Sequence, residues 1–301
     1  MAQIHSPRLS YLPFLLPRLS TFFHTARIDP GSNIGWFSYE GVPLRWHWPV
    51  GLLYDLFSGA QGVTVSGRQV REGGRAGNEG LDENEGVGRA SGESVGKETL
   101  PWRLEVHFEE WPEDQLVRLD DEGKVMHDAF INAVKEADFL RNGTAKGIMS
   151  LSKDDSTKLW NAVETHDITS FMSINQKLLD PPGAKLRHVP LKVYLPSSAS
   201  SAEQNISPSA GGEAASPPAA ASLRIVQSLV TPSLTTRNET QTLGAALHTL
   251  LPTLFPSRRT PTLARPVLHG AVVPFTAPVE ELMRAAAYAD GWLHLGVVMM
   301  G

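Results

Sequence analysis

Two segments of this 301-residue chain, far apart in the sequence, follow the same pattern. Gly41 is followed by Pro49 eight positions later, and Gly270 is followed by Pro278 at the same interval. Each proline precedes a valine, and a leucine stands four positions after each proline. Because matched spacings of turn and apolar residues mark matched structure, the pattern predicts two copies of one hairpin–helix–strand unit.

The details of each copy support this interpretation. Glu40-Gly41 and His269-Gly270 each stand between short β-type runs, which is typical of a tight hairpin turn. Proline is favoured in the first turn of a helix, so each proline predicts a helix start. Trp102 and Trp292 then lead runs of strand character. In the first run Trp102, Leu104, Val106 and Phe108 alternate with polar residues, which indicates a strand with one buried face.

The order of the predicted elements defines a fold class. In the C-terminal part the order is strand–strand–helix–strand–strand–helix–strand, which is that of a ubiquitin-like β-grasp. These elements are Val189–Tyr194, Leu223–Val230, Leu243–Leu251, Val267–Leu268, Ala271–Val273, a helix opened by Pro278, and Leu293–Met299. The N-terminal part has the same order without its opening hairpin: a helix over Leu12–Phe22, strands at Trp36–Tyr39 and Val42–Trp46, a helix opened by Pro49, and the Trp102 strand. We therefore expect an α+β protein with two ubiquitin-like β-grasp domains.

The middle of the chain is predicted to be helical. Apolar residues recur at helical spacing over Val125–Leu140, and Asn142-Gly143 ends that helix. Asp154–Ser156 and Asp167 are candidate caps of two further helices, the second of which stops before Pro181. The expected domains are residues 1–118, a small helix-rich domain at 122–182, and residues 186–301.

Two segments have low-complexity composition. Ser58–Glu98 holds eleven glycines and many charges, and Pro196–Ser222 is nearly all Ala, Ser, Pro, Gly and Glu. Neither segment can bury enough apolar surface to offset its ordering entropy, so both are predicted to be disordered inserts. Met1–Ile28 has no acidic residue, which leaves two readings open: a helix entering the first domain, which we favour, or an organellar transit peptide.

Composition excludes several classes of function. The chain has no cysteine, so it cannot carry a thioester or use a thiol nucleophile. Its net charge of −5 disfavours a nucleic-acid binder. Ten histidines show no paired ligand spacing, so His47, His107 and His269 are expected to serve packing or hydrogen bonding, and neither a metal nor a cofactor is expected.

Several blocks of sequence resemble the autophagy protein 5 family. The similarity runs from about Pro7 to Met299, apart from the inserts, and two of its blocks are highly specific: residues 35–56, GWFSYEGVPLRWHWPVGLLYDL, and residues 134–138, VKEAD. The remaining blocks, in the order of the family, are Leu100-Pro101-Trp102, Val106-His107-Phe108, Leu159-Trp160, Ile174–Leu178 and Leu268-His269-Gly270. The fold of this family is two ubiquitin-like domains around a helix-rich one, as the pattern analysis also indicates.

The resemblance implies a function without an active site. Members of the family are joined through an isopeptide bond on one lysine to the ubiquitin-like autophagy protein 12, and they bind the N-terminal helix of autophagy protein 16. The assembly acts like a ligase: without being catalytic itself, it works with the conjugating enzyme for autophagy protein 8 and promotes transfer of that protein to phosphatidylethanolamine. The acceptor lysine maps onto Lys135. The expected location is the cytoplasm, with peripheral association at the phagophore assembly site membrane.

This chain departs from the family pattern at its N-terminus as well as at the inserts. Family members have a further helix and two strands before the position that matches Pro7, and that helix helps to form the groove for autophagy protein 16. We therefore expect the first β-grasp to lack its opening hairpin and to expose a sheet edge.

The surroundings of Lys135 can be considered separately from the family. A lysine ε-amine is almost wholly protonated at neutral pH, and only the free amine attacks a thioester. The conjugating enzyme must therefore supply deprotonation, while the acceptor supplies an accessible and positioned lysine. On the expected helix Lys135 lies beside the Phe130–Val134 stripe, with Ile131 and Phe139 as its neighbours four positions away. Its stem could rest on them while the amine reaches outward.

Two alternatives remain at this stage. The first is a ubiquitin-like adaptor that binds partners without being conjugated. The second, the least favoured, is a serine hydrolase, because Gly92-Glu93-Ser94-Val95-Gly96 fits the G-x-S-x-G pattern. That pattern needs a strand before it and a helix after it, and here it lies within low-complexity sequence.

Overall fold

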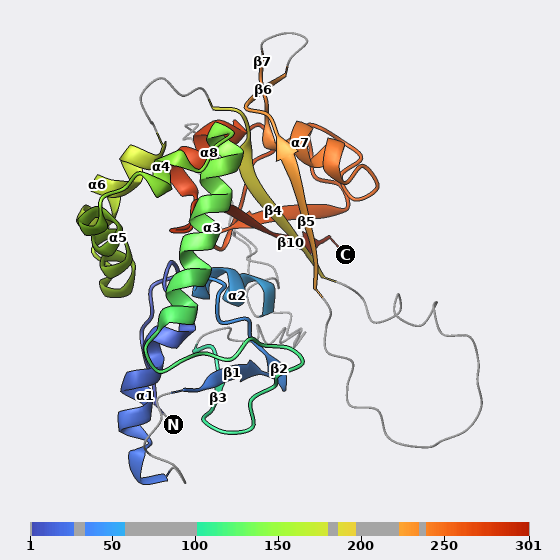
Figure 1. Cartoon of the computed structure of the whole chain (residues 1–301). Coiled ribbons are helices and arrows are strands. Elements are labelled where there is room, and N and C mark those ends of the chain that lie inside the picture. Colours follow the sequence, from blue (N-terminus) through green and yellow to red (C-terminus); the bar gives the residue numbers. More distant parts are fainter. Residues whose placement is uncertain are drawn as a thin grey trace, which may run out of the picture.

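The computed structural model describes residues 2–26, 34–57, 101–179, 186–196, 223–234 and 239–300. The two predicted inserts lie outside these residues, apart from Pro196, and so does the Gly92–Gly96 motif. In Figure 1 the long helix α3 stands in the middle of the molecule, with one small sheet below it and a larger sheet beside its upper half. This arrangement agrees with the predicted α+β architecture.

The C-terminal β-grasp unit has a five-stranded sheet in the order β5-β4-β10-β8-β9. Strands β4 and β10 run parallel at its centre, and the other neighbours are antiparallel. Its elements are β4 (Val189–Pro196), β5 (Leu223–Val230), α7 (Leu243–Leu250), β8 (Ala264–Leu268), β9 (Ala271–Val272), α8 (Val279–Ala286) and β10 (Leu293–Met299), with a short β6–β7 pair (Ser233–Leu234 and Glu239–Thr240) before α7. The predicted element order is confirmed for this unit.

The N-terminal β-grasp unit is smaller, with a three-stranded sheet in the order β2-β1-β3. Its elements are η1 (Leu12–Leu15), α1 (Leu16–Phe22), η2 (His24–Ala26), β1 (Trp36–Tyr39), β2 (Val42–Pro43), α2 (Val50–Phe57) and β3 (Glu105–His107). Three predictions were wrong in extent, and the first is the strand expected at Val42–Trp46, which covers only Val42–Pro43. The expected single helix begins as a 3-10 turn, because Pro17 lacks the amide that would bond to the Pro13 carbonyl in a continuous α-helix, and the Leu16 amide bonds to that carbonyl instead. The expected strand from Trp102 to Phe108 pairs over only three residues.

The repeat seen in the sequence is also a repeat in three dimensions. Both hairpin turns use two residues with positive φ, at 49° and 79° for Glu40-Gly41 and at 52° and 83° for His269-Gly270. Such mirror-image turns match the right-handed twist of the strands they join. After each turn the proline forms an isolated bridge with the segment before the first helix, Pro49 with Tyr11 and Pro278 with Thr242.

The two units differ at one sheet edge. In the C-terminal unit β10 lies between β4 and β8, whereas its counterpart β3 has a neighbour on one side only among the described residues. The inward-facing Leu293, Leu295 and Val297 of β10 are buried, while Val106 of β3 stays half-buried. Within the described residues, the apolar face of β3 is therefore only partly covered.

The helical region consists of α3 (Lys124–Asn142), α4 (Lys146–Met149), α5 (Lys153–Thr165) and α6 (Ile168–Leu179). Gly143, with φ of 72°, ends α3 as predicted. The Asp167 carboxylate accepts from the amides of Thr169 and Ser170, so that predicted cap is confirmed. The prediction for α5 was wrong by two residues, because the Ser152 hydroxyl, and not Asp154–Ser156, caps the helix by accepting from the Asp155 amide at 3.0 Å.

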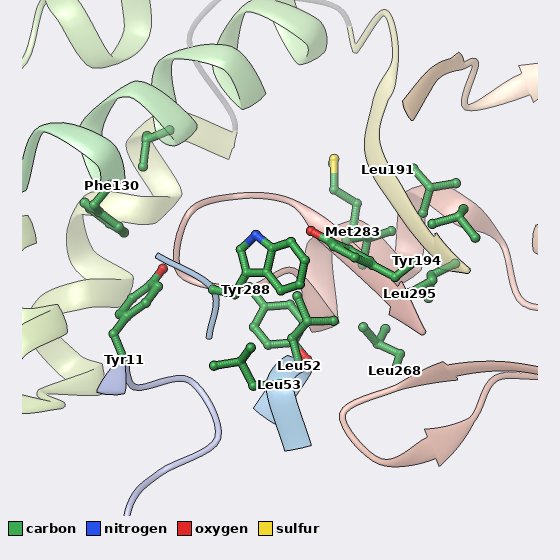
Figure 2. Close-up of a cluster of buried hydrophobic side chains, with 14 of the residues drawn as sticks. Tyr11, Leu52, Leu53, Phe130, Leu191, Tyr194, Leu268, Met283, Tyr288 and Leu295 are labelled. Carbon is green, nitrogen blue, oxygen red and sulfur yellow. The ribbon is translucent and has the colours of Figure 1, made fainter. Parts of the chain in front are cut away.

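One hydrophobic core joins the three parts. Figure 2 shows Tyr11, Leu52 and Leu53 of the N-terminal unit near Tyr288 and Leu268 of the C-terminal unit, with Phe130 of α3 beside Tyr11. All of these side chains are at most 5% exposed. The position of α3 relative to both sheets is therefore fixed by shared packing.

A buried carboxylate also joins the two β-grasp units. The Asp55 side chain in α2 forms an ion pair with Arg8, and its second oxygen accepts from the Gly270 amide of the C-terminal unit at 2.8 Å. Burial raises the pKa of Asp55, and the hydrogen bond and charge of Arg8 oppose that increase. Asp55 thus satisfies donors from both units at once.

We expect Asp55→Ala to lower the free energy of unfolding by about 2 to 3 kcal/mol, because a buried ion pair and a buried backbone donor lose their common acceptor. Urea denaturation measures this change. Asp128→Ala, whose side chain is 75% exposed, is the control and should change stability by less than about 0.5 kcal/mol. Equal stabilities of the two variants would contradict a bridging role for Asp55.

Candidate functional site

Lys135 lies in the second half of α3 and is half-buried. Its neighbours at four residues' distance are Ile131, half-buried, and Phe139, which is 57% exposed. Among the residues that the structure describes, none forms a hydrogen bond or ion pair with the Lys135 amine. Lys135 therefore lies on a helix, four positions from an apolar side chain in each direction, and its amine is unengaged within the part of the chain that the structure describes.

Two residues shortly after Lys135 in the sequence lie inside the protein. Ala137 and Asp138 are fully buried. The Asp138 carboxylate accepts from the Asn142 side chain at 2.7 Å and from the Ile148 amide at 3.0 Å, which ties α4 to α3. In the Lys-Glu-Ala-Asp motif, the first two residues are thus at least partly exposed, and the last two are buried and fix the helix in the fold.

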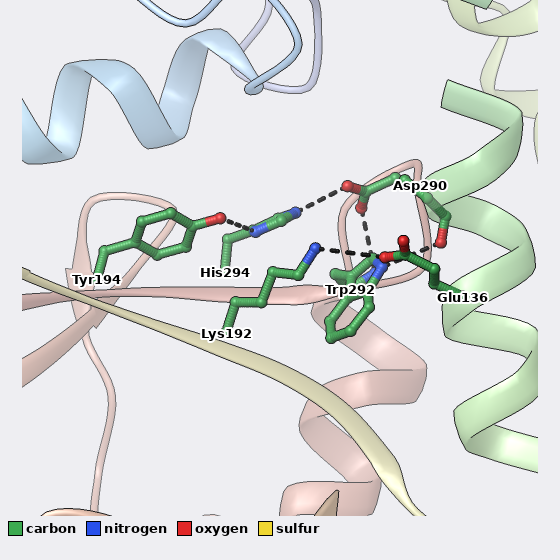
Figure 3. A network of polar contacts seen from close by, with 7 residues as sticks. Glu136, Lys192, Tyr194, Asp290, Trp292 and His294 are labelled. Atoms are coloured by element: carbon green, nitrogen blue, oxygen red, sulfur yellow. Dashed lines mark hydrogen bonds and ion pairs between the residues drawn. The ribbon is translucent and has the colours of Figure 1, made fainter. Parts of the chain in front are cut away.

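Glu136 connects α3 to the C-terminal sheet. Its carboxylate lies 3.8 Å from the Lys192 amine of β4, and that amine stands 3.9 Å from the centre of the Trp292 ring. The Trp292 indole nitrogen in turn donates to the Ala133 carbonyl of α3 at 3.0 Å. Figure 3 shows Lys192 above Trp292 and pointing toward Glu136. Two contacts with the C-terminal unit are therefore concentrated on the helix turn that carries Lys135.

Trp292 is also joined to a series of buried polar contacts, which Figure 3 shows. Asp290 accepts from the Trp292 amide at 3.1 Å and lies 2.8 Å from His294, whose other ring nitrogen is 2.8 Å from the Tyr194 hydroxyl. Burial by itself would raise the pKa of Asp290, but the His294 ring, the Trp292 amide and the Lys192 charge together hold the pKa below its ordinary value.

This depressed pKa predicts acid sensitivity. A carboxylate with a lowered pKa in the folded state contributes stability above its unfolded pKa of about 4, and that contribution is lost as the pH falls. Asp290→Asn removes the titrating group, so wild type should lose stability more steeply than the variant below about pH 4. Urea denaturation between pH 3 and pH 7 measures both curves, and parallel curves would contradict the assignment.

A cavity of about 230 Å³ opens where the three parts of the molecule meet. Its lining comes from the N-terminal unit, from α3 and from β4, β5 and the β10 region, and its members are Tyr11, His47, Trp48, Met126, Ala129, Phe130, Ala133, Lys192, Tyr194, Ile225, Gln227, Asp290 and His294. Ile225 is 43% exposed at one wall. The cavity lining therefore combines apolar side chains with polar and charged ones.

The histidines singled out from the sequence make structural contacts. His107 stacks on Trp36 at 3.9 Å and lies 2.8 Å from the Ser38 hydroxyl, and His269 lies 2.9 Å from the Ala286 carbonyl. His47 meets the rings of Trp46 and Trp48 edge-on. Within the described ranges, no three His, Cys, Asp or Glu side chains gather closely enough to hold a metal ion. None of the helices in these ranges is both long and apolar enough to cross a membrane.

Sequence reasoning missed the contacts made by Lys192, Asp290 and Trp292. The sequence indicates Trp292 only as the start of a strand, and nothing near it in the sequence indicates a hydrogen bond to Ala133, which is 159 positions away. The one available signal was the tryptophan itself, because a buried indole N–H needs an acceptor.

Comparison with known proteins defines the class first. Family models match three regions: Autophagy protein ATG5, UblA domain, at residues 1–108; its alpha-helical bundle region, at residues 123–181; and its UblB domain, at residues 188–297. The protein is thus a ubiquitin-like protein in which two such domains flank a helical bundle, and the predicted fold class is confirmed.

The relatives then identify the family. Autophagy protein 5 of Neosartorya fischeri is 51% identical over 314 residues, covering 99% of this chain and 86% of that protein. Autophagy protein 5 of Aspergillus oryzae is 51% identical over 304 residues, covering 99% and 88%. The chain belongs to the autophagy protein 5 family, so the predicted resemblance is confirmed. A crystal structure of Kluyveromyces marxianus Atg5 has the same fold, with a TM-score of 0.63 at 20% identity, covering 98% of this chain and 86% of that one.

Proposed function

We propose that this protein is a conjugation scaffold of autophagy, in which Lys135 accepts the ubiquitin-like autophagy protein 12 through an isopeptide bond. The observation that carries the proposal is the environment of Lys135, in a chain that belongs to this family. Its amine has no hydrogen-bonding partner among the described residues, and its helix is fixed by packing against both β-grasp units. An acceptor needs this combination of a free amine and a rigid support.

The chemistry of the remaining steps belongs to partners. The chain has no cysteine, so the thioester must be carried by the conjugating enzymes. We propose that the conjugate, together with autophagy protein 16, positions the conjugating enzyme for autophagy protein 8 and so promotes its transfer to phosphatidylethanolamine. We propose that the protein acts in the cytoplasm and peripherally at the phagophore assembly site membrane.

The junction cavity supports the non-covalent part of this proposal. A helix of autophagy protein 16 docked over Ile225 and the cavity would bury apolar surface from all three parts of the molecule. Such a docking mode uses one apolar face of the partner helix, and the exposed Ile225 side chain is suited to contact it.

The test is isolation of the tagged protein from fungal cells whose own family member has been deleted, followed by mass spectrometry of the slower-migrating species. The expected result is a branched peptide at Lys135 that ends in the modifier's C-terminal residue. The half-exposed face of β3 supports the second candidate, an adaptor that binds partners without conjugation. Partner recovery without any adduct would favour that adaptor and exclude the acceptor function.

A further inference from the structure

The helix turn of residues 133–136 is held by the C-terminal sheet at both of its ends. At one end the Ala133 carbonyl accepts from the Trp292 indole at 3.0 Å, and at the other Glu136 pairs with Lys192 at 3.8 Å. Lys192 is itself placed over the Trp292 ring. Trp292 therefore takes part in both connections, directly at Ala133 and through Lys192 at Glu136.

Trp292 is rigidly fixed. It is fully buried, and its own amide donates to the Asp290 carboxylate, which is held in turn by His294. In addition, Gly291 lies against Ala137 and Arg141 of α3, so closely that a Cβ at Gly291 would stand 3.2 Å from that of Ala137. The loop before β10 thus contacts α3 on both sides of the turn that carries Lys135.

These contacts control the rotation of α3 about its own axis. Side-chain ends lie roughly 5 to 6 Å from a helix axis, so a rotation of about 20° moves a side-chain end by about 2 Å. Displacements of this size in a reacting group lower reaction rates substantially. Of these two polar connections, the Glu136–Lys192 pair is partly exposed and is the weaker, and the hydrogen bond from Trp292 to Ala133 is the stronger.

We infer that Trp292 is a positioning residue for Lys135. By holding the Ala133 carbonyl and supporting Lys192 against Glu136, it sets the direction in which the Lys135 amine faces the conjugating enzyme that carries the modifier as a thioester. This inference rests on the proposed function of Lys135 as the acceptor. The C-terminal β-grasp unit would then contribute to the conjugation step through a residue that touches neither the amine nor the modifier.

The test is conjugation in vitro with purified activating enzyme, conjugating enzyme and modifier, comparing the wild-type chain with Trp292→Phe. Phenylalanine keeps an aromatic ring in place and removes the indole donor. The maximal rate constant should fall roughly threefold to tenfold relative to wild type, the order expected for a misplaced nucleophile. The concentration of thioester-loaded conjugating enzyme that gives half the maximal rate should stay within about twofold of the wild-type value.

Trp46→Phe is the matched control. Trp46 is also buried, at 5% exposure, and its indole also donates to a backbone carbonyl, that of Val117 at 2.8 Å. This variant loses the same kind of hydrogen bond away from α3, so its rate should equal the wild-type rate at temperatures where both variants are folded. Equal rates for Trp292→Phe and wild type, or an equal loss in both variants, would overturn the inference.

Two further arms keep the result interpretable. If Trp292→Phe does not fold, Lys192→Met replaces it, with an expected rate loss of about twofold to threefold, and an unchanged rate overturns the inference. If the wild-type chain itself forms no adduct at Lys135, the proposed acceptor function fails, and this outcome is distinct from a wild-type adduct whose rate is insensitive to Trp292.

Discussion

Replacing Lys135 by arginine is expected to abolish the covalent adduct completely. Arginine keeps the positive charge and nearly the same length, but its guanidinium stays protonated in proteins and is not acylated by a thioester. Because Lys135 is half-buried at the helix surface and unpartnered within the described residues, the substitution leaves the fold unchanged. Immunoblotting of a tagged chain shows the result as loss of the slower-migrating band.

Lys124→Arg is the control for this experiment, since Lys124 lies on the same helix and its exposed side chain pairs with Glu122. The control should retain a wild-type amount of adduct. An adduct that persists in Lys135→Arg, with a branched peptide at another lysine, would remove Lys135 from the proposed function.

The largest expected effect on stability comes from Phe130→Ala. Phe130 is 3% exposed and lies at the meeting point of two parts of the molecule, with its ring centre 6.4 Å from that of Tyr11 and 5.5 Å from that of Trp160. Removing such a ring costs the transfer free energy together with the cavity left behind. We expect the free energy of unfolding to fall by about 3 to 5 kcal/mol, measured by urea denaturation.

Phe139→Ala provides the comparison on the same helix. The Phe139 ring is 57% exposed, so its removal should change the free energy of unfolding by less than about 1 kcal/mol. A small effect for Phe130→Ala, or similar effects for both variants, would show that α3 is not held by the packing described above.

Local signals in the sequence predicted the fold well. The turn pairs Glu40-Gly41 and His269-Gly270 were found because positive φ at consecutive residues restricts which residues fit. The predictions were wrong where a neighbouring residue or a neighbouring strand, and not the local pattern alone, decides the structure. Ser152 rather than Asp154 caps α5, and β3 pairs over three residues because a strand extends only as far as a neighbouring strand supports it.

Only a part of the candidate site could be predicted from the sequence. The placement of Lys135 between Ile131 and Phe139 follows from helical spacing alone. The roles of Lys192 and Trp292 do not, because a cation placed over a ring and an indole bound to a helix carbonyl depend on how distant segments meet. Neither segment has a periodic pattern that would predict this contact.

The continuity of the core from Tyr11 through Phe130 to Tyr288 has a consequence for how the molecule melts. Since neither sheet can lose its packing without exposing side chains of the other, the three regions should unfold together. A calorimetric trace should then show one heat-absorption peak, with equal van't Hoff and calorimetric enthalpies. Damage far from position 135 would, on this basis, reduce the acceptor lysine's availability simply by depleting the folded population.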